Sequence, residues 1–181
     1  MWRRIKGIPV SLAMVFMVLL IMGGVVMGNR NALNRASVSV WAELADLQAQ
    51  VGDMADKAGN YLKLAGRLGI PDQEMKALTN AQDAALRFAN QSIRSYGINA
   101  AVKLNEHAAA LDEAAMALDA RIRETQQSVT ERNAVYDDWR IVRLVETDKD
   151  AYNQNAQHLR SMYASLPARV LLSGIFPPLF K

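Results

Sequence analysis

The chain of 181 residues has no cysteine, and glycine and proline contribute only 10 and 5 residues. Without cysteine, the protein has no disulfide framework, cysteine-ligated zinc site, iron–sulfur cluster or thiol nucleophile. The scarcity of glycine and proline, together with 28 alanines, favours an all-α fold. The length corresponds to about one domain, since domains average roughly 150 residues.

Acidic residues are absent from the first part of the chain, where Glu43 is the first. The formal charge of +3 therefore comes from Arg3, Arg4 and Lys6, because residues 29–181 carry 18 basic and 18 acidic side chains. A nucleic-acid-binding domain would carry a basic patch or stripe. This balance argues against nucleic acid as a partner.

Charged residues are also absent between residues 8 and 28, where Ser11 is the only polar side chain. A helix of this length spans about 31 Å, which matches a hydrocarbon core of about 30 Å. The run predicts a transmembrane anchor at residues 8–28, with the lipid bilayer as a partner. A signal peptide cleaved before Asn29 and a buried soluble helix are the alternatives, although secretory apolar segments usually run only about 7–15 residues.

The basic residues that flank this run predict its orientation. Three precede it and two follow it, namely Arg3, Arg4, Lys6, Arg30 and Arg35. The more basic flank of a membrane helix usually stays in the cytoplasm. We therefore expect residues 1–7 in the cytoplasm and the rest of the chain, after the anchor, on the other side of the membrane.

Glycine and proline divide residues 29–167 into helical segments, which predicts an antiparallel four-helix bundle. A polar stretch and a capping box place the last turn at 124–128, with 133–138 as an alternative. The expected helices cover residues 31–68, 71–96, 98–124 and 128–166.

Apolar residues in the first and third helices recur at alternating spacings of three and four, which predicts two seams of a left-handed bundle. The first seam consists of Val40, Leu44, Leu47, Val51, Met54, Ala58, Tyr61, Ala65 and Leu68. The other consists of Ala101, Leu104, Ala108, Leu111, Ala115, Leu118 and Ile122. Small residues recur every seven positions beside the first seam, which favours a closely packed neighbouring helix over simple tolerance of glycine: Ala45, Gly52, Gly59 and Gly66.

The sequence Ala-Tyr-Asn at 151–153, followed by Leu-Pro at 166–167, resembles the C-terminal signature of the LemA family. Lys149 occupies the position that is usually arginine, and Val145 an aliphatic position before it. The chain departs from the pattern at 159–160, where Leu-Arg replaces a second Tyr-Asn pair. An N-terminal membrane helix that leads into a long heptad helix is also similar to the family.

The resemblance implies a membrane-anchored antiparallel helical bundle of a mostly bacterial family without an established enzyme activity. We therefore expect a scaffold or protein-interaction module at the bacterial inner membrane, with a protein partner or a homo-oligomer. The alternative is an extracytoplasmic sensor of a ligand or signal. Such a sensor would need a partner protein, because only about seven residues precede the predicted anchor.

Motifs for catalysis, metal binding or cofactor binding are missing from the sequence, so we expect none of these activities. His107 and His158 lack the Glu-x-x-His spacing of di-iron bundles and the His-x-x-x-His spacing of zinc helices. A Gly-x-Ser-x-Gly elbow and a glycine-rich phosphate loop are also missing. Carboxylate clusters such as Asp112-Glu113 and Asp137-Asp138 are typical of the solvated face of a helix.

Three features of the C-terminal region are candidates for contacts. Tyr152 and Asn153 are expected to pack and form hydrogen bonds near the end of the bundle, or to contact a partner. Pro167 is expected to end the last helix, before an apolar tail at residues 168–181. We expect this tail to cap the membrane-proximal end of the bundle or to lie in the lipid interface, and either position would bring Phe176 and Phe180 near the anchor.

Overall fold

The computed structural model describes residues 10–125, 129–144 and 146–164, and these are helical apart from short connections. The side chains of most residues from 10 to 29 lie outside this description. The described part contains no strand, and the predicted all-α fold is confirmed. Its helices are α1 (Val10–Arg67), α2 (Asp72–Ala89), the 3-10 helix η1 (Ile93–Asn99), α3 (Ala100–Glu124), α4 (Val129–Val142) and α5 (Glu146–Ala164).

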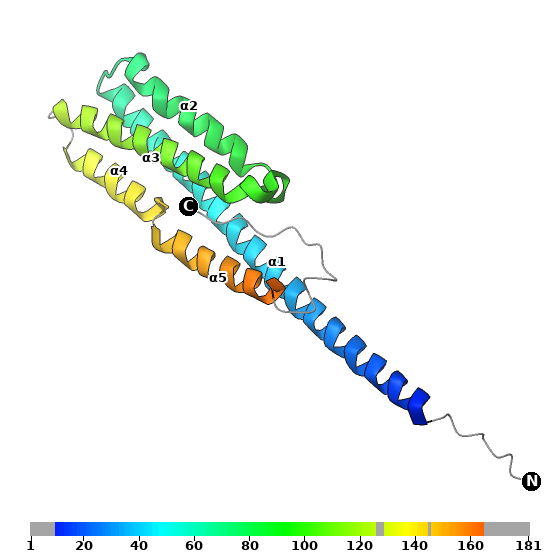
Figure 1. The fold of residues 1–181 in the computed structure, drawn as a ribbon. Coiled ribbons are helices and arrows are strands. Elements are labelled where there is room, and N and C mark those ends of the chain that lie inside the picture. Colours follow the sequence, from blue (N-terminus) through cyan, green and yellow to red (C-terminus); the bar gives the residue numbers. More distant parts are fainter. Residues whose placement is uncertain (1–9, 126–128, 145, 165–181) are drawn as a thin grey trace, which may run out of the picture.

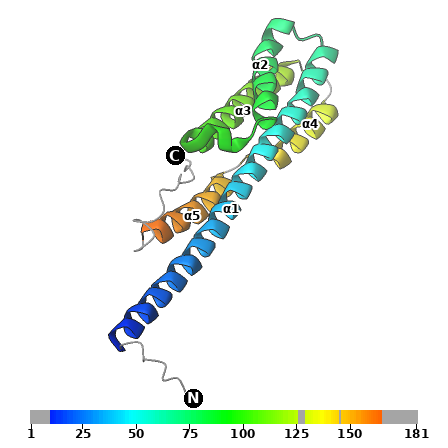
Figure 2. The same cartoon turned by 90° about the vertical axis from the view of Figure 1, so that its right-hand side faces the viewer.

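A single helix of 58 residues, α1, forms the axis of the molecule. α2, α3 and α4 pack along its C-terminal half, and α5 continues from α4 toward the middle of α1 (Figures 1 and 2). Short connections make the helices from α1 to α4 antiparallel in succession, whereas α5 runs in the same direction as α4 (Figure 1). The N-terminal part of α1 projects beyond the bundle, and we call residues 10–32 the stalk.

The predicted membrane span coincides with most of the stalk, while residues 8 and 9 and most side chains of the span lie outside the described ones. Met17, Val18 and Leu20 are described, and they are 66%, 55% and 68% exposed. The described residues contain no helix with the length and apolar character that a bilayer crossing requires.

The end of α1 follows from the glycine after Leu68. Gly69 has a φ of 73°, a conformation that glycine adopts without strain. The Ile70 amide donates to the Ala65 carbonyl at 3.0 Å, and the Gly69 amide donates to the Gly66 carbonyl at 3.2 Å. This pair of bonds is the Schellman motif, which closes the helix before Pro71 starts the next one.

The second helix ends earlier than predicted, at Ala89 instead of residue 96. The side-chain amide of Gln48 on α1 donates to the carbonyls of Phe88, at 2.6 Å, and Gln91, at 2.9 Å. These contacts hold the chain as it leaves the helix, and η1 follows with a positive φ of 52° at Gly97.

The turn before α4 lies where predicted, because α3 ends at Glu124 and α4 begins at Val129. The alternative at 133–138 is wrong, since these residues lie within α4. The prediction of one continuous last helix is also wrong, because the helix is interrupted between Val142 and Glu146. There the Gln50 side chain donates to the Val142 carbonyl at 3.3 Å and so replaces the helical amide donor.

The core confirms both predicted seams. Every predicted seam residue of α3 is buried, and so are those of α1 except Leu68, which is half-buried. The stripe of small residues approaches a neighbouring helix closely at only some of its positions. A Cβ atom added to Gly52 would lie 3.2 Å from the Cβ of Ala89, whereas one added to Gly66 would have no neighbour within 4 Å.

Candidate functional site

The predicted pair Tyr152 and Asn153 lies on α5, which packs against α1. Tyr152 is fully buried and Asn153 is half-buried, and both side chains have interaction partners. Burial raises the pKa of Tyr152, so its hydroxyl keeps the proton at neutral pH. Near this pair, the Asn155 amide donates to a Glu43 carboxylate oxygen at 3.1 Å. Pro167, Phe176 and Phe180 lie outside the described residues.

A buried carboxylate on α3 forms the strongest polar cluster that the sequence did not reveal. Asp119 is 2% exposed, and its two oxygens accept hydrogen bonds from the guanidinium of Arg132 on α4, both at 2.9 Å. Arg123, one turn along α3, donates to the same carboxylate at 3.0 Å. This bidentate pair satisfies the buried charge, which would otherwise destabilise the fold.

Tyr61 on α1 lies close enough to this cluster for the charge of Asp119 to affect its pKa. Its side chain is fully buried, and its hydroxyl has no hydrogen-bond partner in the described part of the chain. Burial, and then the negative charge of Asp119, raise the pKa of Tyr61. The ring packs edge-on against Trp139, with centroids 6.0 Å apart. A tyrosine of this kind fills the core, and its hydroxyl keeps its proton at neutral pH.

Two sets of ion pairs connect α4 to the bundle. In one set α4 supplies the acidic side chains, and in the other Arg132 and Arg143 supply the basic ones. On the α1 side, α4 supplies the acids: Asp138 meets Lys57 at 2.9 Å, and Glu131 meets Arg67 at 3.4 Å. On the α3 side, Arg132 of α4 pairs with Asp119, and Arg143, the residue directly after α4, pairs with Asp112. A further ion pair between helices joins Arg121 of α3 to Glu74 of α2 at 2.6 Å.

The expectation of a solvated face holds for Glu113 and Asp137, which are exposed, but not for Asp112 and Asp138, which contact other helices. Asp112 accepts hydrogen bonds from the Trp139 indole at 3.2 Å and from Arg143 at 2.6 Å. Asp138, as described, bridges to α1. The spacing of seven residues between Asp112 and Asp119 was the available signal, since it places two acids on one face of α3.

An apolar groove lies between α1 and η1, and we call it the Trp41 groove. Its described lining is Val38, Trp41, Ala42, Ala45, Gln48, Gln91, Ser92, Ile93 and Arg94. Val38 is 52% exposed, and the Arg94 guanidinium carbon lies 5.9 Å from the centre of the Trp41 ring. The Gln48 amide is already hydrogen-bonded to backbone carbonyls. Among the described lining residues, no nucleophile is paired with a base.

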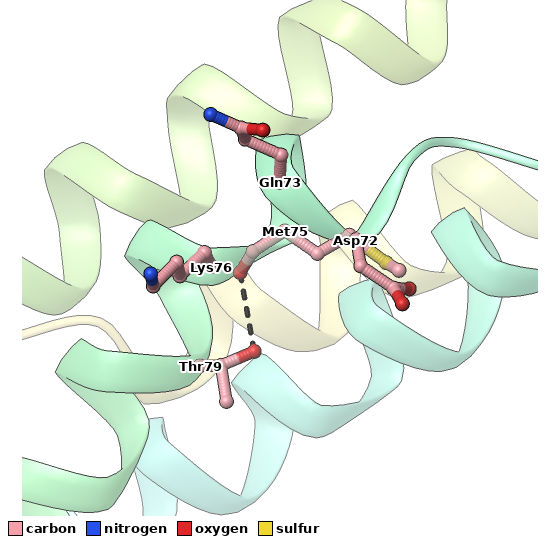
Figure 3. A pocket seen from close by; sticks show the side chains of 5 residues that line it. All are labelled: Asp72, Gln73, Met75, Lys76 and Thr79. Carbon is pink, nitrogen blue, oxygen red and sulfur yellow. Dashed lines mark hydrogen bonds between the residues drawn. The ribbon is translucent and has the colours of Figure 1, made fainter.

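A second hollow lies on the outer side of the start of α2 (Figure 3). The Thr79 hydroxyl donates to the Met75 carbonyl one turn earlier, at 3.1 Å. The other residues that line this hollow are Asp72, Gln73 and Lys76. All five residues come from the beginning of one helix, and none of them combines a free nucleophile with a neighbouring base.

His107 lies half-buried against the core. Its ring centre is 4.7 Å from that of Phe88, a buried residue of α2. Burial lowers the pKa of His107, which therefore remains neutral at physiological pH. His158 is exposed on α5. Within the described ranges, no three His, Cys, Asp or Glu side chains lie together in a way that would hold a metal ion.

Comparison with known proteins gives no relative for this chain: no family profile, curated protein or solved structure matches it. The resemblance to the LemA family stays a prediction. The described polar clusters connect helices to one another.

Proposed function

We propose that this chain is a membrane-anchored helical-bundle protein of LemA type that acts as a scaffold or protein-interaction module. The observation that carries this proposal is the exposed apolar surface of the stalk. The likeness at residues 151–167 supports the LemA assignment, and the long single helix α1 suits a module held away from its anchor.

The described side chains of the stalk include three large apolar ones that are exposed. Met17, Val18 and Leu20 are each more than half exposed, and a Cβ atom added to Gly24 or Gly28 would have no neighbour within 4 Å. Exposed apolar side chains that lie close together favour contact with a membrane or another protein. The absence of charge between residues 8 and 28 favours lipid as the covering medium.

The polar clusters of the bundle support an interaction role more than a catalytic one. Asp119 is neutralised by Arg132 and Asp112 by Arg143, and the raised pKa values of Tyr61 and Tyr152 keep both hydroxyls protonated. General acid–base catalysis uses groups whose pKa lies near the working pH.

Single cysteines test the anchor and its orientation, because the natural chain has none. Ala110→Cys places a thiol on the exposed side of α3, and Gly7→Cys places one before the predicted anchor. In intact spheroplasts, a membrane-impermeant maleimide should label the first variant and spare the second. Labelling of Gly7→Cys alone reverses the orientation, and recovery of the protein in the soluble fraction overturns the anchor.

Gentle detergent extraction tests the interaction role. The full chain should elute from a sizing column as a complex with a stoichiometric protein partner or as a homo-oligomer. A monomer with a co-purifying small molecule would favour the sensor alternative. A bare monomer after cross-linking in intact cells would contradict the scaffold role.

A further inference from the structure

The Trp41 groove continues the face of α1 on which α2 packs. Toward the C-terminus of α1 the two helices lie close together, since a Cβ atom added to Gly52 would lie 3.2 Å from the Cβ of Ala89, the last residue of α2. Ala45 and Val38 precede Gly52 at intervals of seven residues and point within about 40° of it. Both are nevertheless exposed. The groove is therefore the part of the α2-facing side of α1 that α2 does not cover.

This side stays open because the chain turns away at the end of α2. The Gln48 amide holds the carbonyls of Phe88 and Gln91 there, and η1 follows and forms the second wall of the groove, to which Ile93 contributes. Along α1 the described lining extends from Val38 to Gln48, which corresponds to about 15 Å or three turns of helix.

The wall formed by η1 adds a positive charge to this apolar surface. Arg94 is exposed, and its guanidinium carbon lies 5.9 Å from the centre of the Trp41 ring. Among the described residues, no carboxylate forms an ion pair with Arg94, and the described lining of the groove contains no acidic side chain. An occupant with a carboxylate beside an apolar face would complement this lining in both respects.

Continuity with the α1–α2 interface favours a helix as the occupant, because a helix already covers the same face of α1 directly beyond the groove. The α1 of a second copy is 58 residues long and, if it followed the groove, would run into α2. We propose that the Trp41 groove docks one helix of a different protein, with its apolar face on α1 and a carboxylate beside Arg94. This inference rests on the proposed interaction role and names the kind of partner that this surface fits.

Two synthetic helices test this occupant. Both are about four turns long, carry leucine and alanine on one face and contain a lactam bridge, because short isolated helices are marginal in water. One carries glutamate along one margin of the apolar face, and its twin carries glutamine there. Each is labelled with a fluorophore and titrated into the full chain in phosphatidylcholine nanodiscs, with empty nanodiscs as the blank, and fluorescence anisotropy measures binding.

Four variants locate the bound helix. Arg94→Gln removes the charge of the groove, and Arg87→Gln removes that of another exposed arginine, on α2. Val38→Asn removes an exposed apolar side chain from the groove, and Ile141→Asn removes one from α4. All four side chains are exposed, so these substitutions should leave the fold intact.

The glutamate helix should bind the natural chain about fivefold more tightly than its glutamine twin, as one exposed ion pair allows. Arg94→Gln should remove this preference, whereas Arg87→Gln should retain it. Val38→Asn should weaken the binding of both helices at least about threefold, whereas Ile141→Asn should not. Absence of binding, or equal effects within either pair of variants, overturns the proposal.

Two further outcomes would assign the groove to another occupant and also overturn the proposal. Binding of laurate that requires Arg94, without binding of either helix, would assign it to an anionic amphiphile. Self-association of the chain that is lost in Val38→Asn but not in Ile141→Asn would assign it to a second copy. The sizing experiment on detergent extracts decides separately whether the chain is an interaction module.

Discussion

The guanidinium of Arg132 and the carboxylate of Asp119 face each other in a bidentate pair, with both N–O distances at 2.9 Å. The side chain of Asp119 is only 3% exposed and that of Arg132 only 14%, so the pair joins α3 to α4 away from bulk water. Arg123 contacts the same carboxylate, but its side chain is 57% exposed. One buried acid is thus held by two arginines of very different exposure.

Replacement of Arg132 by alanine should destabilise the bundle strongly, since it leaves Asp119 buried without its main partner. We expect a loss of about 3 kcal/mol in the free energy of unfolding, at the low end for a broken buried pair because Arg123 remains. Arg123→Ala is the matched control and should cost less than about 1 kcal/mol, as exposed pairs do. Urea unfolding of the full chain in mild detergent measures both, and similar losses would refute the assigned roles.

Leu111 on α3 provides a test of the predicted seam. Its side chain is fully buried, whereas Glu113 two residues later is exposed. Leu111→Ala should lower the free energy of unfolding by about 2–5 kcal/mol, through lost apolar contacts and the cavity that remains. Glu113→Ala should change it by no more than about 0.5 kcal/mol. The prediction fails if the exposed position costs as much as the buried one.

Gly52 and Gly66 of α1 have different surroundings, so substitution by alanine should change the stability of the protein differently at the two positions. Gly66→Ala adds a methyl group in open space and should stabilise the protein by up to about 1 kcal/mol through helix propensity. Gly52→Ala gains the same propensity but brings its Cβ to 3.2 Å from the Cβ of Ala89. We expect a higher melting temperature for Gly66→Ala than for Gly52→Ala. The reverse order would mean that α2 does not approach α1 closely at Gly52.

Acidification should weaken the bundle through His107. Burial lowers its pKa below the ordinary value of about 6.5, so the unfolded chain takes up a proton before the folded chain does. The contribution to stability is therefore complete above about pH 6.5 and decreases as the pH falls toward the lowered pKa. His107→Gln should flatten this part of the stability–pH curve. His158→Gln, at an exposed position, is the control, and equal flattening by both would contradict the assignment.

The seams of α1 and α3 could be predicted from sequence because burial follows the helical repeat of each segment alone. The ends of α2 and α4 could not. They depend on Gln48 and Gln50 of α1, which donate to carbonyls 40 and 92 residues later in the chain. No local pattern of propensity or spacing contains such a contact.

The candidate site was less predictable than the fold for a related reason. Asp119 follows the seam residue Leu118, and a charged residue beside a seam is normally solvated. Its burial depends on Arg132, which belongs to another helix. Tyr152 could be expected to be buried because its own helix supplies the apolar neighbours Ala156 and Leu159 at helical spacing.

Because the stalk and the bundle share one helix, their relative rotation is fixed by helical phase. One residue inserted between Gly28 and Leu33 would turn every face of the bundle by about 100° about the stalk and lift it by about 1.5 Å. Seven inserted residues would lift the bundle by about 10 Å yet return each face to within about 20° of its starting direction. The length of the stalk therefore sets both the distance of the bundle from the start of α1 and the direction in which each face of the bundle points.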